Sequence, residues 1–299
     1  MANTNNAEIP EAEQALVFSQ SETDDLLQSV NDRIAQGTFE VNNHELLQRM
    51  VDSLADSRGM VRLGLVEALG KVGKPTTPFL VGGLSSNPNP VVRRSCAKAL
   101  AIVADNNAVS SLIHSLLHDE DTVVRASSAG ALARMGETAV TALLEIIGSP
   151  DSPATTKGQA SWALSFIGTE AKELLYPAIH SDSPDVRVSV VAALGNQEEQ
   201  LKGDREAVDL LIGAVKDNSP LVRAEAATAL GRVAGADALE PLISCLEDVD
   251  DEVRKSVALR LMKIGEPRAI EFLQLALDRE QSEPVGKVIQ LAINQLNLF

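Results

Sequence analysis

Hydrophobic and small residues follow a pattern that recurs along most of the chain. The segment from Val123 to Gly136 (VVRASSAGALARMG) shows it in full: a Val-Arg pair, a run of small residues, an Ala-Leu pair and a closing glycine. Seven segments share this outline, and their basic anchors lie 31, 32, 32, 30, 36 and 31 residues apart. These anchors are Arg62, Arg93, Arg125, Lys157, Arg187, Arg223 and Arg254. Self-similarity at such a period is typical of a solenoid.

Each repeat is predicted to form two short helices. In the repeat anchored at Arg125, residues 108–117 place Leu112 and Leu116 on one apolar face, at helical spacing. A polar run at 118–121 breaks the pattern, and residues 122–135 then form an alanine-rich second helix that a glycine closes. Because no such helix pair can bury its own apolar face, the units must stack. The sequence therefore predicts an all-α fold, an α-solenoid of helical hairpins that is superhelical and has a concave groove.

Acidic residues precede several of the Val-Arg pairs. Together with the arginines they resemble the Asp/Arg ladder of HEAT repeats, so the repeats are predicted to be HEAT-like. The acidic residues are Asp121, Asp185, Asp217 and Asp251. On this interpretation the anchor arginines join neighbouring repeats and do not bind a ligand.

Two positions of each second helix are predicted to face the groove. Counted from the anchor, positions +3, +4, +6 and +7 are small or apolar almost everywhere and are predicted to form the core. Positions +5 and +9 vary, and they lie one helical turn apart on one face. In a HEAT-type solenoid the second helices line the concave surface, so the +5 and +9 side chains are expected to look into the groove.

An aromatic pair falls on this predicted groove face. Trp162, the only tryptophan of the chain, is at +5 and Phe166 is at +9 of the same helix. Because exposed aromatic residues are unfavourable without a use, the pair is predicted to be a platform for a flat, partly anionic ligand or a partner helix. The alternative is that Trp162 fills the space left by the small Gly130. Polar and basic residues on the same face, which can hold carboxylates, complete the predicted site: Arg134, Asn196, Lys98 and Arg232, with Lys71 and Lys263 at equivalent positions.

The repeats have boundaries at both ends. Residues 1–22 are polar and acidic without a period, and they are predicted to be a disordered tail. A helical cap is expected over 23–59, HEAT-like repeats over 60–280 and a closing helix over 281–299. The polar segment 196–204 lengthens one period to 36 residues and is predicted to be a surface loop.

Composition and charge exclude several classes of partner. The 299-residue chain has a net charge of −16, which opposes binding to nucleic acid and to anionic membrane surfaces. It has no apolar run long enough to cross a membrane, so no membrane insertion is expected. Its first residues lack the basic region and apolar core of a signal peptide, and the expected location is the cytoplasm.

Few side chains outside the groove face suggest chemistry. Cys96 and Cys245 are predicted to be buried small residues, because free cysteines are often buried. His114 and His118 have a spacing that can bind a metal, but neither a third ligand nor an HExxH motif accompanies them, so no metal site is expected. Tyr176 is predicted to face outward or toward the ridge between repeats.

The repeats resemble a family of cyanobacterial proteins. The Val-Arg and Ala-Leu-Gly pattern is similar to that of the HEAT-like phycobilin lyases of the E/F type (CpcE/CpcF) and their relative NblB. Four segments are most similar to the CpeF/MpeV group, the lyases for phycoerythrin. They are DSRGMVRLG at 56–64, NPNPVVRR at 87–94, residues 119–134, and ASWALSFIG at 160–168.

The resemblance implies a substrate and a reaction. A lyase of this family binds a linear tetrapyrrole, here phycoerythrobilin, and directs its thioether attachment to a cysteine of a phycoerythrin subunit. Some relatives also isomerise the bilin to phycourobilin. The bilin would be substrate, so no cofactor is expected, and the partners would be the phycobiliprotein subunit and, in a heterodimer, a second lyase subunit. No catalytic residue is identified; Glu67 and Glu225 are the candidates for a groove acid.

Two other functions are open at this point. NblB-like relatives act in phycobilisome disassembly, which suggests a non-catalytic chaperone or adaptor for phycobiliproteins. A further HEAT-repeat relative is linked to iron–sulfur scaffold proteins, which suggests a scaffold for iron–sulfur assembly factors. Bilin binding separates the first two functions from the scaffold, and covalent transfer separates the lyase from the chaperone.

Overall fold

The computed structural model describes residues 18–197, 199–201, 203–233 and 235–298. In these ranges the chain forms α-helices joined by turns and short 3-10 segments, with no strand. By contacts it divides into two compact units, Met1–Ala131 and Leu132–Phe299. The prediction of an all-α solenoid is confirmed.

Helical hairpins build both units. The first helices of the hairpins are α2 (His44–Asp52), α4 (Thr77–Ser86), α6 (Val109–His118), α8 (Glu137–Gly148), α10 (Lys172–Ala178), α12 (Arg205–Ala214), α14 (Leu239–Ser244) and α16 (Ala269–Arg279). The second helices are α3 (Gly59–Val72), α5 (Pro90–Val103), α7 (Thr122–Arg134), α9 (Ala154–Ile167), α11 (Pro184–Gly195), α13 (Pro220–Val233), α15 (Asp251–Ile264) and α17 (Glu283–Leu296). Helix α1 (Gln20–Ala35) packs on α3.

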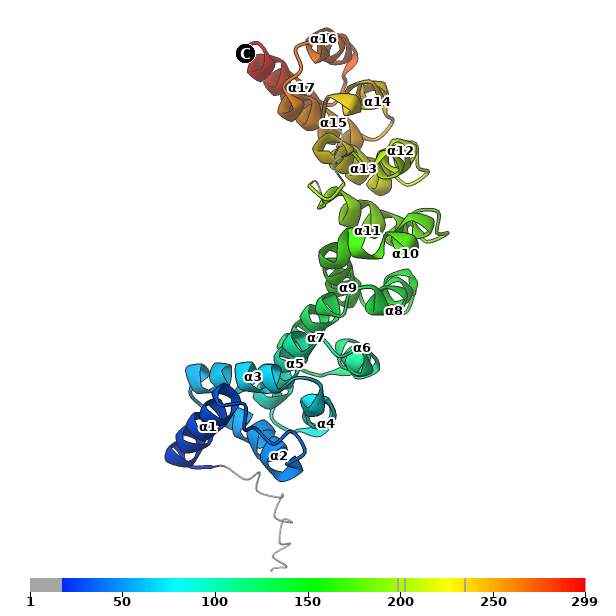
Figure 1. Ribbon diagram of the computed structural model, residues 1–299. Helices are drawn as coiled ribbons and strands as arrows, with labels where there is room; N and C mark the ends of the chain where they lie inside the picture. Colours follow the sequence, from blue (N-terminus) through cyan, green and yellow to red (C-terminus); the bar gives the residue numbers. More distant parts are fainter. Residues whose placement is uncertain (1–17, 198, 202, 234, 299) are drawn as a thin grey trace, which may run out of the picture. The chain divides into compact units, whose positions relative to one another are not determined.

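In the second unit the two sets of helices form two layers. Helices α8, α10, α12, α14 and α16 lie in one layer, and α9, α11, α13, α15 and α17 in the other (Figure 1). The second helices pack on their sequence neighbours more extensively than the first helices do. Small side chains allow this close packing: a Cβ added at Gly195 would lie only 2.5 Å from the Cβ of Ala229 on α13. Neighbouring second helices therefore form a continuous layer that fixes the spacing of their outward side chains.

Local sequence sets where the second helices begin and end. A proline occupies the first helical turn of α5, α11, α13 and α17, where its missing N–H costs nothing. Asp250 caps α15, because its carboxylate accepts from the backbone N–H of Glu252 and Val253 at 2.9 and 3.2 Å. At the other end, Gly265 adopts φ 76°, a conformation that favours glycine.

The core follows the predicted positions. In all seven repeats the residues at +3 and +7 are buried, as Leu65 and Leu69 illustrate with no exposed surface. Six repeats also bury alanine at +6, and the exception is Arg260. The core is therefore a layer of alanine, leucine and valine between the two sets of helices.

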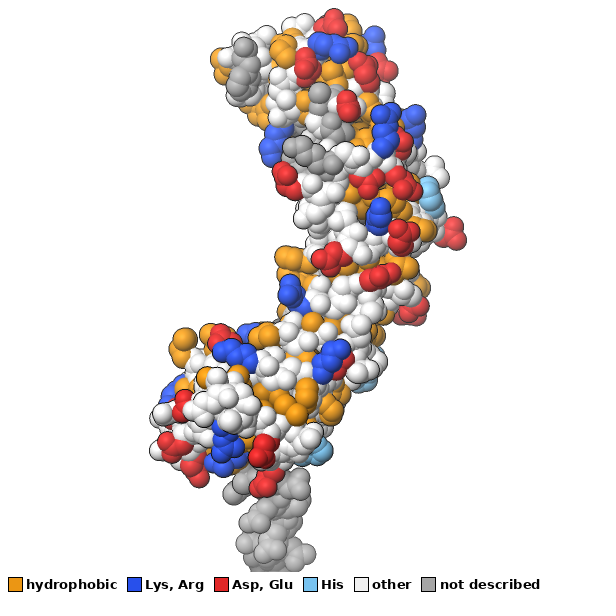
Figure 2. Space-filling model, viewed as in Figure 1, with side chains coloured by type: hydrophobic (Ala, Val, Ile, Leu, Met, Phe, Trp, Pro, Cys, Tyr) orange, Lys and Arg blue, Asp and Glu red, His pale blue; other side chains and the backbone are white. Residues whose placement is uncertain are grey.

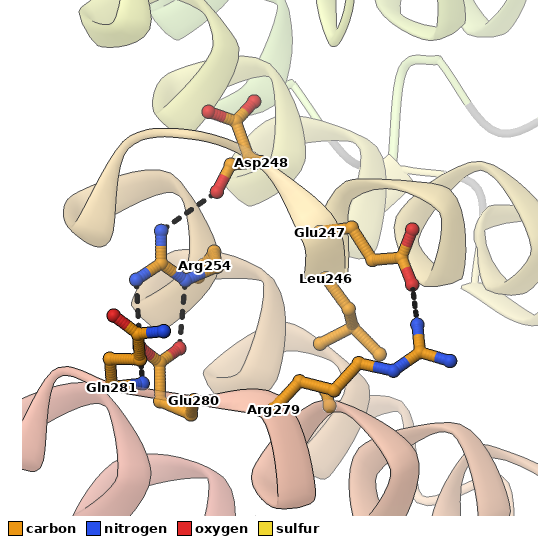
Figure 3. Close-up of a pocket in the computed structure, with 8 residues that line it drawn as sticks. Leu246, Glu247, Asp248, Arg254, Arg279, Glu280 and Gln281 are labelled. Atoms are coloured by element: carbon orange, nitrogen blue, oxygen red, sulfur yellow. Dashed lines mark hydrogen bonds and ion pairs between the residues drawn. The ribbon is translucent and has the colours of Figure 1, made fainter.

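A ladder of ion pairs links successive repeats. Arg187 donates from Nε and Nη2 to Asp217 at 2.7 and 2.8 Å, and Arg223 does the same to Asp248 at 2.7 Å. Arg93 pairs in this way with Asp119, and Arg254 with Glu280. Figure 3 shows Arg254 between the Asp248 backbone and Glu280. Two parallel bonds to one carboxylate are among the strongest ion-pair geometries, so these arginines hold repeats together, as predicted.

The acidic partners differ in part from those predicted. Asp185 and Asp217 do pair with the cation of the preceding repeat, at 2.6 Å from Lys157 and 2.7 Å from Arg187. The prediction was wrong for Asp121, whose carboxylate accepts from the backbone N–H of Val123 and Val124 at 2.8 and 2.9 Å. The turn before α7 carries three acids: Asp121 caps the helix, Asp119 pairs with Arg93 at 2.9 Å, and Glu120 lies 3.4 Å from the same arginine.

Asp251 is the second such difference. Its carboxylate lies 2.8 Å from Arg254 in its own repeat. The carboxylates that form the ladder here are Asp248, which pairs with Arg223, and Glu280, which pairs with Arg254. Glu280 also accepts from the backbone N–H of Ser282 at 2.9 Å, just before the last helix. The ladder therefore ends on a glutamate, a residue type that the sequence pattern had not included.

The ends and the insertion can be compared with their predicted boundaries. Residues 1–17 of the predicted tail lie outside the described residues, and α1 begins at Gln20, inside the segment predicted as a tail. Helix α17 lies within the predicted closing segment 281–299. The insertion 196–204 is mostly exposed where it is described, but Leu201 is buried and Asp204 caps α12 by accepting from the Ala207 N–H at 3.1 Å. This loop is thus fixed to the repeats at two points.

Within the described ranges, no helix has the length and apolar character needed to cross a membrane. On the side drawn in Figure 2, acidic and basic side chains are interspersed over the helices, with hydrophobic side chains exposed between them.

Candidate functional site

The side chains at +5 and +9 of the second helices form an exposed stripe in each unit, called here the second-helix face. It consists of Glu67, Lys71, Lys98, Ile102, Gly130, Arg134, Trp162, Phe166, Ala192, Asn196, Thr228, Arg232, Leu259 and Lys263. Every one of these residues is exposed or half-buried, whereas +3 and +7 are buried throughout. The repeat pattern therefore separates stacking side chains from those that can meet a ligand.

Trp162 and Phe166 form an aromatic pair on α9. Their ring centroids are 4.6 Å apart with an interplanar angle of 53°. Trp162 is 49% exposed and Phe166 63% exposed. Contact between the rings orients both, and Trp162 still presents about half of its surface to a ligand and Phe166 more than half.

Polar groups fix the end of α9 beside this pair. The Ser165 hydroxyl donates to the Trp162 carbonyl at 2.7 Å, and the Gln197 side-chain N–H donates to the Ser165 carbonyl at 3.0 Å. Gly168 leaves the space that Gln197 occupies, because an added Cβ there would lie 2.4 Å from the Gln197 amide. Gln197 was not predictable from the repeat pattern, since a loop residue has no position in the repeat register.

Asn196 and Arg232, both predicted as ligand-binding residues, lie together. The Arg232 Nη1 group donates to the Asn196 side-chain oxygen at 2.9 Å. Asn196 follows the last turn of α11, and Arg232 is in the last turn of α13, the next second helix. Position +9 therefore holds Phe166 in α9, Asn196 just after α11 and Arg232 in α13, and the hydrogen bond joins the last two.

The other predicted site residues take part in neither of these two pairs. Arg134 is exposed near the end of α7, and it has no hydrogen bond or ion pair to any described residue. Lys98 and Glu67 are exposed on α5 and α3, in the first unit. Glu225 is half-buried on α13. The structure thus brings Trp162 to Phe166 and Asn196 to Arg232, while the roles of the six groove residues and two acids stay predictions.

One residue of this region was missed in the sequence. It is Arg260 on α15. Burial lowers its pKa, the charge of Arg232 lowers it further, and Glu225 raises it. The signal was present, because Arg260 stands where the six other repeats have alanine. It was assigned to the core because its position, +6, is a core position elsewhere.

Other reactive groups are engaged in the fold. Cys96 and Cys245 are buried, as predicted, and burial raises the pKa of both thiols. Tyr176 is buried, and its hydroxyl donates to Asp204 at 2.9 Å; burial is the main cause that raises its pKa. The rings of His114 and His118 are 4.7 Å apart, and no group of three or more metal-ligating side chains occurs among the residues described.

The cleft drawn in Figure 3 is part of the ladder. Its volume is about 380 Å³. Its charged side chains are paired with one another or with Arg223: Asp248 with Arg223, Arg254 with Glu280, and Arg279 with Glu247. A ligand there would have to displace ion pairs that join repeats, so the second-helix face is the better candidate site.

Stacked helical hairpins, an Arg/Asp ladder and an exposed face of second helices define a HEAT-repeat protein. The family model for HEAT repeats matches residues 27–101, 44–133, 109–195, 171–254 and 214–294. Among solved structures, Kap121p bound to the extreme C-terminus of the protein phosphatase Cdc14p has a TM-score of 0.52 at 15% identity; the match covers 96% of this chain and 43% of that one. Kap121p alone has a TM-score of 0.50 at 15% identity, over 92% of this chain and 41% of that one. These likenesses concern the fold alone.

Two proteins of similar sequence define the family more closely. The chain is 35% identical over 279 residues to the bilin biosynthesis protein MpeU of Synechococcus sp. (strain WH8020), covering 93% of this chain and 94% of that one. An uncharacterized phycocyanin operon protein Z of Pseudanabaena tenuis (strain PCC 7409) is 26% identical, over 52% of this chain and 81% of its own length. The chain belongs to the E/F-type family of HEAT-repeat bilin lyases, which confirms the family inferred from the repeats.

Proposed function

We propose that this protein is a bilin lyase. It binds phycoerythrobilin on the second-helix face and directs the attachment of this linear tetrapyrrole to a cysteine of a phycoerythrin subunit, in the cytoplasm where phycobilisomes are assembled. The family supports a role in bilin handling, since MpeU is named as a bilin biosynthesis protein. The observation that carries the proposal is the half-exposed Trp162 and Phe166 pair, whose centroids are 4.6 Å apart.

A bilin matches this face in two respects. Its conjugated rings offer a flat apolar surface, which stacks favourably on tryptophan and phenylalanine. Its two propionates are carboxylates, which guanidinium groups bind with paired hydrogen bonds. Arg232 is aligned with Phe166 through the +9 positions, and Arg134 is exposed without a protein partner among the described residues.

The proposed reaction is an addition, so the atoms balance without an oxidant or a reductant. The sulfur of the subunit cysteine forms a bond to the ethylidene carbon of the bilin, the ethylidene double bond is consumed, and the thiol proton ends on the bilin. Isomerisation to phycourobilin would only move double bonds within the tetrapyrrole. Both buried cysteines of this chain are unsuited as nucleophiles, because burial raises the pKa of each thiol. The nucleophile therefore belongs to the subunit.

The contribution of the protein to this reaction is mainly positioning. Holding the bilin and the subunit cysteine together converts a bimolecular addition into an effectively unimolecular one. Glu67 and Glu225 are retained as candidates for moving the proton. Glu225 is in the same unit as Trp162 and Phe166 and raises the pKa of Arg260, whereas Glu67 is in the first unit.

Co-expression tests the proposal. A bacterial host that makes phycoerythrobilin would express the phycoerythrin α and β subunits with and without this protein. Subunits separated under denaturing conditions are then examined by zinc fluorescence and by absorbance in acid. We expect covalent colour on one subunit only when this protein is present, and its wavelength reports whether isomerisation occurred. A stable complex with a subunit but no covalent adduct would contradict the lyase and favour the chaperone.

A further inference from the structure

Arg260 departs from the repeat in a way that stacking does not explain. Position +6 is a fully buried alanine in the repeats that contain α9, α11 and α13, as Ala163, Ala193 and Ala229 show. In α15 the same position holds Arg260, which is half-buried. Placing a guanidinium where alanine suffices is costly, because charge is removed from water.

The preceding helix accommodates this arginine. A Cβ added at Gly231 on α13 would lie 3.1, 3.2 and 3.3 Å from the Cβ, Cδ and Cγ atoms of Arg260. The aliphatic part of the side chain therefore lies directly on the glycine backbone. Gly231 is adjacent in sequence to Arg232, so this packing places Arg260 beside the part of α13 that carries Arg232.

No residue that the structure describes pairs with the guanidinium of Arg260. Its Nε atom is buried without a hydrogen bond, and the described residues supply neither a hydrogen bond nor an ion pair to it. Burial lowers the pKa of Arg260, the charge of Arg232 lowers it further, and Glu225 acts in the opposite direction without forming an ion pair. Arginine nevertheless stays charged at neutral pH.

Arg232 likewise has no carboxylate partner in the part of the chain that the structure describes. Its hydrogen bond goes to the neutral Asn196 oxygen at 2.9 Å, and no ion pair to a described residue involves it. The ladder arginines are different, since Arg187 and Arg223 each grip a carboxylate with two bonds. In a chain with a net charge of −16, two neighbouring guanidinium groups without an acidic partner indicate a site that an anion from outside completes.

We propose that Arg232 and Arg260 form a carboxylate-binding site, in which Asn196 holds Arg232 in place, and that its ligand is a propionate of the bilin. The choice of ligand rests on the proposed function. The +9 row runs from Phe166 on α9 through Asn196 to Arg232 on α13, so an extended ligand stacked on the aromatic pair continues toward the two arginines. Planar guanidinium groups match the geometry of a carboxylate.

A pair of bilins tests this site. Phycoerythrobilin and its dimethyl ester, whose propionates carry no charge, would be titrated by absorbance into the full-length protein and into Arg260→Ala. The substitution restores the alanine of the other six repeats, so we expect an unchanged thermal transition. We expect Arg260→Ala to bind phycoerythrobilin about tenfold more weakly and the dimethyl ester equally well, because one charge-assisted hydrogen bond is lost.

Matched variants make the result specific. Arg268→Ala removes the same charge from an exposed ion pair with Glu240, 3.0 Å apart, and should leave both affinities unchanged. Arg260→Lys keeps the charge but loses the planar fork, and it should fall between Arg260→Ala and the unsubstituted protein. Equal affinity of Arg260→Ala and the unsubstituted protein for phycoerythrobilin would overturn the carboxylate site alone. Equal weakening of the binding of phycoerythrobilin and its dimethyl ester by Arg260→Ala would also overturn the carboxylate site. If the unsubstituted protein binds neither bilin, the proposed function is overturned as well.

Discussion

A single residue, Trp162, carries most of the functional argument. Its position at +5 predicted exposure, and its side chain is 49% exposed beside Phe166. The exposure of +5 and +9 was predictable because helical geometry assigns faces to positions. The contacts of individual side chains were not predictable in this way, because Gln197 and Arg260 contact residues of a neighbouring repeat.

The fluorescence of Trp162 gives the first prediction. Because this is the only tryptophan, its emission reports on one place in the molecule. We expect acrylamide to quench it readily in the free protein and bilin to quench it on binding. The alternative, in which Trp162 fills the space beside Gly130, requires a ring that is shielded from acrylamide. Resistance to acrylamide in the free protein would therefore contradict the exposed platform.

At the scale of helices, the ladder explains why the repeats stack in register. The arginine positions were predictable because they anchor the repeat, but two of the four acids were misassigned. Asp119 and Asp121 are both in the turn before α7, and only the structure shows that Asp121 caps the helix while Asp119 pairs with Arg93. Side-chain paths across a turn do not follow from the spacing of residues alone.

The energy of the ladder gives a second prediction. Arg223 and Asp248 are 13% and 11% exposed, so Arg223→Ala leaves a poorly hydrated carboxylate and two backbone carbonyls without a donor. We expect the free energy of unfolding to fall by about 2–3 kcal/mol, between the values for surface and buried ion pairs. Denaturant unfolding measures it. The control is Arg268→Ala, whose pair with Glu240 is 68% and 69% exposed and should change stability by at most about 1 kcal/mol. If both variants lost the same free energy of unfolding, the ladder pair would stabilise the protein no more than an exposed ion pair does.

At the scale of the whole molecule, stacking of repeats and contact with a ligand use different faces of the second helices. The core uses mostly small and aliphatic residues and the ladder mostly arginine–carboxylate pairs, while the second-helix face differs from repeat to repeat. A repeat period in the sequence was sufficient to predict the solenoid, because each unit contacts mainly its neighbours. The ligand site was predictable only in part, since it depends on departures from the repeat, such as Trp162 and Arg260.

The affinity of phycoerythrobilin for Trp162→Ala tests the central claim most directly. The control is Leu275→Ala, which truncates an exposed hydrophobic side chain on α16, a first helix outside the second-helix face. If the second-helix face around α9 is the bilin site, Trp162→Ala should bind phycoerythrobilin about tenfold more weakly, the loss typical of one stacking contact, with an unchanged thermal transition. Leu275→Ala should bind as the unsubstituted protein does. Equal affinity of Trp162→Ala and the unsubstituted protein would place the bilin elsewhere and contradict the account.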